Sequence, residues 1–252
     1  SVSEAISKPH KSQAAYGQTL DKAATSIETA GDGAGLQAIV SGLTSATRKV
    51  QRENETLEKR LDDSTREVAR LREHLEQVRR DAMTDALTNL ANRKAFDEHL
   101  ETACAQAETG GSALILAVLD IDHFKRFNDT WGHQTGDQVL RYVASVMSRV
   151  ASAPRIAARY GGEEFAMIFP KETLVQVEAA LESIRKEIGS RSLRRRSTDD
   201  ELGAVTLSAG FAQRRPGETA SALLDRADTA LYASKHAGRN RVTSAERLDQ
   251  AA

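Results

Sequence analysis

The chain of 252 residues has only one cysteine, no long apolar run and almost no net charge. A single cysteine, Cys104, excludes an intramolecular disulfide framework and fits a reducing compartment, so we expect a cytoplasmic location. No apolar run approaches the roughly 20 residues that a membrane helix needs, and the N-terminus carries no signal-peptide pattern. Basic residues (35) nearly balance acidic ones (36), so no global charge favours a nucleic-acid or membrane partner.

Glycine and proline are both missing from residues 43–83. Apolar residues there recur alternately three and four residues apart, between positions crowded with charged residues, which is the pattern of a heptad seam. We predict a parallel coiled-coil homodimer over residues 43–83, in which the polar Asn54 fixes the register. A single long helix packed on its own domain is the alternative. The seam positions are Leu43, Thr47, Val50, Asn54, Leu57, Leu61, Ser64, Val68, Leu71, Leu75, Val78 and Ala82.

Residues 1–42 are polar and rich in alanine. Tyr16, Leu20 and Ile27 fall at helical spacing, the glycines of residues 31–35 interrupt the pattern, and apolar residues resume it afterwards. We interpret this segment as helical, serving in sensing or dimerisation, or as a loosely ordered lead-in. It contains no cofactor motif.

Residues 84–246 alternate between strand-like and helical patterns, and residues 247–252 form a tail. We expect a turn in which Asp85 pairs with Arg93, and a buried central strand in the apolar run 113–119. The element order predicts a ferredoxin-like β-α-β-β-α-β sheet with helices on one face. The other expected segments are helices at 93–108, 124–150 (interrupted near Gly132 and Gly136), 172–188 and 220–236, strands at 155–159, 165–169 and 204–212, a short strand from Val242, and a charged loop at 191–201 that contains Arg194, Arg195 and Arg196.

Two acidic clusters follow predicted strands. Asp120 and Asp122 end the central strand and, being two residues apart, could share one face, with Lys125 close by. The pair Gly161-Gly162 predicts a tight hairpin turn with positive φ angles, and Glu163 follows it directly. Carboxylates on rigid backbone suit a hard cation such as Mg²⁺. The alternative is a solvated hairpin with acidic residues that bind nothing.

Several motifs occur in an order that is highly specific. They are Asp85-x-Leu87-Thr88-x-Leu90-x-Asn92-Arg93, Asp120-Ile121-Asp122-x-Phe124-Lys125, Asn128-Asp129-x-x-Gly132-His133-x-x-Gly136-Asp137, Gly161-Gly162-Glu163-Glu164-Phe165 and Lys235-x-x-Gly238-Arg239-Asn240. Over about residues 82–244 the chain resembles the GGDEF-domain family, the bacterial diguanylate cyclases. The resemblance implies an enzyme that condenses two GTP into cyclic di-GMP and releases two pyrophosphates, with one GTP held by each domain of an antiparallel pair.

The resemblance also implies roles for individual residues. Asp120, the backbone carbonyl of Ile121 and Glu163 are expected to bind two Mg²⁺ per site, which Mn²⁺ could replace. Glu163 is in addition the expected proton acceptor, and Glu164 extends the acidic cluster or pairs with Lys125. Lys125 is expected to stabilise charge on the α-phosphate. The expected substrate contacts are guanine recognition by Asn128 and Asp137, phosphate binding by the amides of His123 and Phe124 and by Lys235 and Arg239, which lie one helical turn apart, and further contacts from His133 and Leu140.

One motif of the family is missing here. Many members carry an inhibitory Arg-x-x-Asp site shortly before the Gly-Gly pair, where this chain has Ser152-Ala153-Pro154-Arg155. We therefore expect no product inhibition through that site, and we expect coiled-coil geometry to control activity. The alternative is a catalytically silent module that binds GTP or a protein partner.

Overall fold

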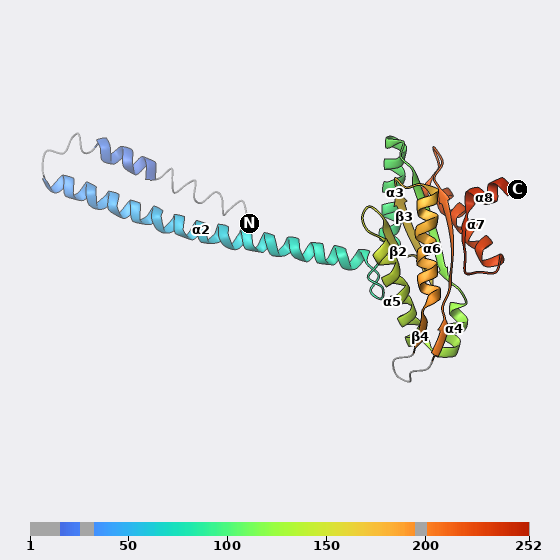
Figure 1. Ribbon diagram of the computed structural model, residues 1–252. Coiled ribbons are helices and arrows are strands. Elements are labelled where there is room, and N and C mark those ends of the chain that lie inside the picture. Colours follow the sequence, from blue (N-terminus) through green and yellow to red (C-terminus); the bar gives the residue numbers. More distant parts are fainter. Residues whose placement is uncertain (1–15, 26–32, 195–200, 252) are drawn as a thin grey trace. The chain divides into compact units, whose positions relative to one another are not determined.

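The computed structural model describes residues 16–25, 33–194 and 201–251 (Figure 1). The chain forms two compact units that meet between Gln77 and Val78. Ile27, Arg195 and Arg196, which carried expectations above, lie outside the described residues.

The first unit is helical. Residues 16–25 form one helix, and α2 (Gly33–Met83) runs for 51 residues, as expected for a stretch with no proline. The Tyr16 hydroxyl lies 3.1 Å from the Thr47 hydroxyl oxygen and joins the two helices. The seam residues of α2 that stay exposed include Leu61 (70%) and Leu75 (66%), so packing within the described chain leaves an apolar stripe on α2 uncovered.

The second unit is built on a five-stranded sheet in the order β2-β3-β1-β6-β7. The central strand β1 pairs antiparallel with β3 and with β6, and β7 runs parallel to β6 at the edge. The first four strands therefore have the ferredoxin-like order, which confirms the predicted fold. The strands are β1 (Leu114–Ile121), β2 (Ile156–Arg159), β3 (Glu164–Pro170), β6 (Leu207–Gln213) and β7 (Val242–Ser244).

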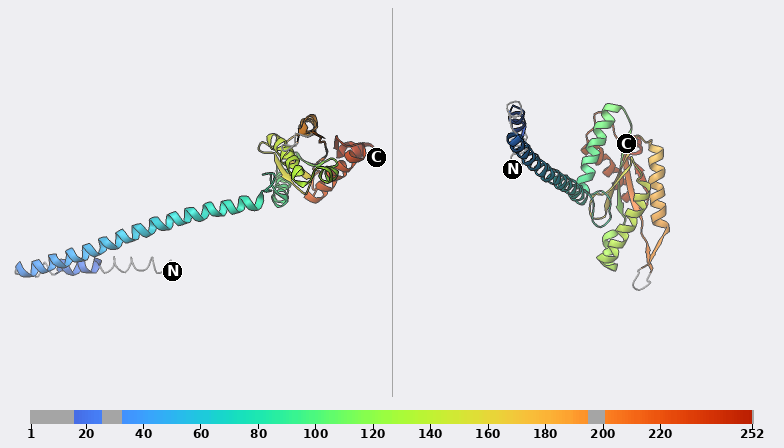
Figure 2. Two further views of the ribbon diagram at one scale, coloured as in Figure 1. Left: turned by 90° about the horizontal axis from the view of Figure 1, so that it is seen from below. Right: turned by 90° about the vertical axis from the view of Figure 1, so that its left-hand side faces the viewer.

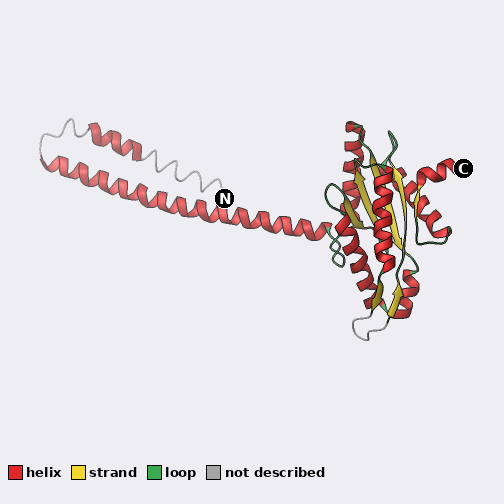
Figure 3. Ribbon diagram, viewed as in Figure 1, coloured by secondary structure: helices red, strands yellow, loops and turns green. Residues whose placement is uncertain are grey.

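Helices cover both faces of this sheet (Figures 2 and 3). The crossover helices α5 (His133–Val150) and α6 (Leu174–Ser190) pack on one face, as predicted. The other face is covered by α3 (Arg93–Gly110) and α7 (Ala220–His236), so the expectation of helices on one face alone is wrong. Every residue of β1 is consequently buried, and its side chains alternate between the two apolar clusters.

Four local details differ from the sequence-based expectations. Only Gly132, with φ 80°, separates α4 (Phe124–Trp131) from α5, and Gly136 lies inside α5. The expected loop at 191–201 contributes instead to a small sheet of β4 (Ser192–Arg194) and β5 (Glu201–Ala204). The strand expected at 204–212 begins only at Leu207. A helix, α8 (Ala245–Ala251), stands where a tail was expected.

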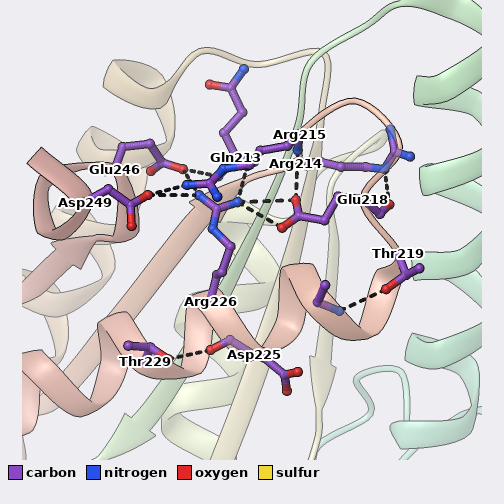
Figure 4. Close-up of polar contacts among 11 residues, drawn as sticks. Gln213, Arg214, Arg215, Glu218, Thr219, Asp225, Arg226, Thr229, Glu246 and Asp249 are labelled. Carbon is purple, nitrogen blue, oxygen red and sulfur yellow. Dashed lines mark hydrogen bonds and ion pairs between the residues drawn. The ribbon is translucent and has the colours of Figure 1, made fainter.

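Arg226 of α7 is the centre of a polar network that holds α8 (Figure 4). Its guanidinium donates to the Gln213 carbonyl oxygen at 2.9 Å and to both Glu218 oxygens at 3.2 and 3.3 Å. It also donates to Glu246 of α8 at 2.9 Å. The ends of β6, α7 and α8 are thus tied together. Across the described ranges, no helix is both long and apolar enough to cross a membrane.

Candidate active site

The acidic residues meet where β1 ends beside β3. The register places Asp120 opposite Glu164, and the Ile121 amide donates to the Glu163 carbonyl oxygen at 3.3 Å. The structure thus brings Asp120, Ile121 and Glu163 together from segments more than forty residues apart in the chain. Asp120 is only 5% exposed, so its charge sits where water screens it little.

Burial and neighbouring charge both act on these carboxyls. Burial raises the pKa of Asp120, an effect that the Lys235 ammonium opposes and the Glu164 and Asp122 carboxylates reinforce. Burial also raises the pKa of Glu163, and the Asp120 charge adds to it. The Lys235 Nζ lies 2.8 Å from an Asp120 carboxylate oxygen, a contact that sequence reasoning did not anticipate because α7 is distant in sequence. Crowded carboxylates of this kind are stabilised by a bound positive charge.

The donor set suits a hard cation. Within the described residues no three His, Cys, Asp or Glu side chains converge on one point, so a cation here would use two carboxylates, a backbone carbonyl and oxygens of a substrate. Asp120, Glu163 and the Ile121 carbonyl supply only oxygen ligands, which Mg²⁺ prefers. The residues present therefore fit the expected metal.

The backbone conformation of the Gly161-Gly162 turn differs from the one expected. The Tyr160 and Gly161 amides both donate to the Glu164 carbonyl oxygen, at 2.9 and 3.1 Å. Neither glycine has a positive φ, so that prediction is wrong. A Cβ on Gly161 would stand 2.6 Å from the Glu164 carboxylate, whereas a Cβ on Gly162 would meet nothing within 4 Å. The turn thus needs space at Gly161 and leaves open space at Gly162.

Arg159 stabilises this turn by hydrogen bonds. It donates to the Gly162 carbonyl oxygen at 2.8 Å and to both Asp85 carboxylate oxygens at 3.3 Å. Asp85 also accepts from the Thr88 amide and hydroxyl at 2.9 and 2.6 Å. The predicted Asp85–Arg93 pair is therefore wrong, and Arg93 stacks over the Tyr160 ring at 4.6 Å instead.

A hollow of about 420 Å³ opens next to Glu163. This volume is within the range of small-ligand pockets. It brings together most of the residues predicted to bind substrate, together with Asp129 and Arg159, which sequence reasoning did not assign to the site. The lining residues are Phe124, Lys125, Asn128, Asp129, His133, Asp137, Leu140, Arg159, Gly162 and Glu163. The predicted residues Asp120, Ile121, His123, Glu164, Lys235 and Arg239 lie outside this lining.

Asn128 has an unusual environment in the hollow. Its side-chain oxygen is buried and has no hydrogen-bond partner in the described structure. A Cβ on Gly136 of α5 would stand 1.9 Å from that oxygen, so glycine is required for the amide to lie there. A buried acceptor without a donor is costly, and a ligand that donates a hydrogen would satisfy it.

The second basic group of the site lies beyond α7. The helix ends at His236, and Gly238, Arg239 and Asn240 follow with φ of 108°, 62° and 45°. The prediction that Lys235 and Arg239 lie one turn apart on a helix is therefore wrong, because Arg239 lies beyond the end of α7. The Arg239 amide donates to the Ser234 carbonyl oxygen at 3.0 Å, so the chain turns back sharply after the helix.

Comparison with known proteins agrees with this geometry. The family model "Diguanylate cyclase, GGDEF domain" matches residues 82–241. The diguanylate cyclase VdcA of Vibrio cholerae is 36% identical over 207 residues, which are 82% of this chain and 60% of that protein. The chain thus spans less than two thirds of the length of this relative.

Two solved structures are also similar. One is the coiled coil and GGDEF domain of DgcB from Caulobacter crescentus in complex with c-di-GMP, with a TM-score of 0.73 and 69% identity over 75% of this chain and 99% of that one. The other is the diguanylate cyclase SiaD in complex with its activator SiaC from Pseudomonas aeruginosa, with a TM-score of 0.67 and 31% identity over 90% and 86% of the chains. The chain belongs to the GGDEF-domain family of diguanylate cyclases.

Proposed function

We propose that this chain is a diguanylate cyclase that converts two GTP into cyclic di-GMP and two pyrophosphates. The observation that carries the proposal is that one hollow joins Asn128 and Asp137 to Lys125 and Glu163. Groups suited to holding a base thereby lie next to groups suited to phosphoryl chemistry. The intact acidic cluster argues against a silent binding module.

Guanine recognition would fall to Asn128 and Asp137. The ionised Asp137 only accepts hydrogen bonds, and guanine offers two adjacent donors, its N1 hydrogen and its exocyclic amine. The unpaired Asn128 oxygen is a further acceptor in the same hollow. Adenine lacks this donor edge, so the pair would favour GTP. Leu140 and Phe124 supply apolar lining, and His133 lies at the first turn of α5.

The phosphates would extend from the hollow towards the acidic cluster. Phe124 and Lys125 begin α4, so their amides have no partner inside the helix and can bind phosphate oxygens together with the amide of His123. The Lys125 ammonium would stabilise charge on the α-phosphate, and Lys235 and Arg239 would hold the terminal phosphates.

Asp120, the Ile121 carbonyl and Glu163 would hold Mg²⁺, two per site, with Mn²⁺ as a substitute. The bound cations would neutralise the triphosphate and make the attacking 3′-hydroxyl more acidic. Glu163, whose pKa burial raises, would accept the proton of that hydroxyl while its oxygen attacks the α-phosphorus and pyrophosphate leaves. Glu164 would add to the negative field at the cluster.

The reaction would need two chains, because each chain would hold one GTP and the product forms when two phosphodiester bonds join these two nucleotides. We propose that the exposed seam of α2 pairs two copies in a parallel coiled coil and that its geometry sets how the two sites approach. The related DgcB structure, which has both a coiled coil and a GGDEF domain, supports this proposal. Residues 1–42 would act upstream as a sensing or dimerisation segment.

We further propose that product inhibition through an Arg-x-x-Asp site is absent. Ser152 replaces the arginine, and Arg155 stands where the aspartate would be. Arg155 donates to both Glu172 oxygens, at 2.7 and 2.8 Å, so its guanidinium is already bound within the protein. Noncompetitive inhibition of turnover by low micromolar cyclic di-GMP would contradict this proposal, whereas competition with GTP would point to binding at the active site.

Product formation from GTP and Mg²⁺, followed by chromatography over a range of protein concentrations, tests the main proposal. We expect cyclic di-GMP at a rate per chain that rises as the dimer forms. Glu163→Gln should lower the rate by at least about 100-fold, because general-base catalysis contributes roughly that much, while circular dichroism stays unchanged. A well-folded wild-type chain that binds GTP and forms no product over the whole concentration range would contradict it.

A further inference from the structure

Asp122 follows the metal-binding segment but has partners of its own. Its Oδ1 accepts from the Ser208 hydroxyl at 2.7 Å, and its Oδ2 accepts from the Thr206 hydroxyl at 2.7 Å. Oδ2 also accepts from the backbone amide of Asn240 at 3.0 Å. Three donors from two other segments of the chain thus hold the carboxylate of Asp122, a residue that is only 8% exposed. Asp120 and Asp122 therefore have different partners, since Asp120 contacts Lys235.

The segment that Asp122 holds has an unfavourable backbone. Arg239 and Asn240 both have positive φ, a conformation that is unfavourable for arginine and better tolerated by asparagine. The contacts that enforce it converge on Asn240. Its amide is held by Asp122, and its side-chain oxygen accepts from Arg185 of α6 at 2.8 Å.

Arg239 itself has no ion-pair partner among the described residues. Its side chain is exposed, and the contacts that hold this residue in place are made by the backbone. The Ser234 carbonyl fixes the Arg239 amide, and Asp122 fixes the next residue. The direction in which the Arg239 side chain leaves the backbone thus depends on Asp122, which lies 117 positions earlier in the chain.

We propose that Asp122 is a positioning residue for triphosphate binding: it holds the turn at residues 238–240 so that Arg239 is directed to the terminal phosphates. The inference rests on the proposed role of Arg239 at those phosphates. It assigns Asp122 a function distinct from that of Asp120, although both belong to one short acidic motif. Asp122 acts through Arg239 and does not touch the substrate.

The test compares two ligands that differ at the phosphate end. 3′-Deoxy-GTP lacks the attacking hydroxyl and cannot be joined, and GMP lacks the two terminal phosphates, so calorimetry can measure both affinities without turnover. Asp122→Ala should weaken 3′-deoxy-GTP binding about tenfold, since one contact to a charged group is worth that much, and leave GMP affinity within about twofold. In an Arg239→Ala background, Asp122→Ala should cost no further affinity for 3′-deoxy-GTP.

Two milder variants separate loss of the Asp122–Asn240 contact from general misfolding. Thr206→Val removes one donor to Asp122 but leaves the bond to Asn240, and should keep most of the wild-type affinity. Asp122→Asn keeps the size of the side chain with weaker acceptance, and should fall between wild type and Asp122→Ala. All variants are compared only where circular dichroism shows them folded.

Several results would overturn the inference. Equal weakening of GMP and 3′-deoxy-GTP would show a general structural role, and additive losses in the Arg239→Ala background would show that Asp122 acts by another route. Recovery of affinity at tenfold higher Mg²⁺ would make Asp122 a metal ligand. These affinities do not depend on turnover, so failure of wild type to form cyclic di-GMP would refute the proposed activity alone.

Discussion

At the scale of single residues, Gly161 and Gly162 have different requirements although they are neighbours. Gly161 lies against the Glu164 carboxylate, and Gly162 faces open space in the lining of the hollow. Neither needs glycine for its backbone conformation. A side chain at position 162 would therefore project into open space at the hollow without straining the turn.

We predict that Gly162→Ala leaves the free energy of unfolding within about 0.5 kcal/mol of wild type, because the new methyl group meets no atom. The same change should lower kcat/KM for GTP markedly, because the methyl group projects beside Glu163. Urea unfolding and initial rates measure the two effects. The matched control is Gly110→Ala, whose Cβ would stand 4.0 Å from Ser112 at the end of α3 and should change neither quantity. Unchanged turnover in Gly162→Ala would contradict the assignment.

Much of the candidate site could be predicted from the sequence, because Asn128, His133, Asp137 and Glu163 stand in local motifs. Pairings between distant segments could not. Asp85 pairs with Arg159, which lies 74 positions away, rather than with the nearby Arg93. No local pattern encodes such a contact, since it exists only once α3 and β2 have brought the two segments together.

At the scale of elements, Gly210 of β6 sets how closely α7 approaches the sheet. A Cβ at this position would stand 2.0 Å from the Leu231 amide nitrogen and 2.4 Å from the Ala227 carbonyl oxygen. Both are backbone atoms, which cannot move aside without moving the helix. Since α7 carries Lys235, this close packing also places a residue of the site.

We expect Gly210→Ala to destabilise the protein by about 3 kcal/mol or more, at or above the usual cost of overpacking. Thermal and urea unfolding would measure the loss. The control is Gly189→Ala in α6, where the nearest atom is Thr206 Cγ2 at 4.0 Å. There alanine should be neutral or stabilise by about 0.5–1 kcal/mol through its better helix propensity. Equal stability of both variants would refute the close-packing argument.

The junction of α7 and α8 gives a pH-dependent prediction. Burial would raise the pKa of Glu246, but hydrogen bonds from Ser244 and the Gln213 amide and the charge of Arg226 outweigh it, so the pKa lies below its ordinary value. A lowered pKa in the folded state means that the carboxylate stabilises the fold above pH 4.5 and that this contribution is lost as pH falls through the folded pKa.

We therefore expect Glu246→Gln to be less stable than wild type at pH 7 and to approach wild-type stability near pH 3. Urea unfolding at several pH values between these limits measures the difference. A control is Glu73→Gln, which makes the same substitution at an exposed position of α2. A gap between wild type and Glu246→Gln that stays constant with pH would contradict this account.

Element order and type were largely predictable, because apolar residues in α2 and α7 recur at helical spacing and β1 contains a continuous apolar run. The β4–β5 sheet was not, since its segment is charged and short, and α8 was not, because seven residues give too little pattern. The placement of helices α3 and α7 on the second face of the sheet was not predicted for another reason. The continuous apolar run at residues 113–119 indicated a strand buried on both faces, but the sequence did not say which helices cover the second face.

At the scale of the whole molecule, the exposed seam of α2 is the surface that we propose pairs with a second copy of the chain. Leu61, Val68, Leu71, Leu75 and Val78 are all exposed, at 46–70%. Apolar side chains in a heptad series are normally buried against a partner helix.

We predict that Leu75→Lys weakens dimerisation at least about tenfold, because each buried leucine contributes roughly 1.5–3 kcal/mol and two copies of the substitution meet in one dimer. Sedimentation analysis should show the shift, and cyclic di-GMP formation per chain should fall at low protein concentration. Glu73→Lys, on the opposite side of the same helix turn, adds the same side chain and should leave the dimer intact. Equal behaviour of the two variants would argue against a seam through Leu75.

The Lys235 ammonium rests against Asp120, and so the site carries its own counter-ion. A divalent cation that arrives by itself must compete with a positive charge already in contact, and repulsion between the two lowers its affinity. A triphosphate changes this competition, because it offers Lys235 another anion and brings oxygen ligands for the metal. The cation and the nucleotide would therefore enter as one neutralised unit. In the proposed cycle, Lys235 would balance the charge of the carboxylates when no ligand is bound, and the metal and the nucleotide would each bind poorly without the other.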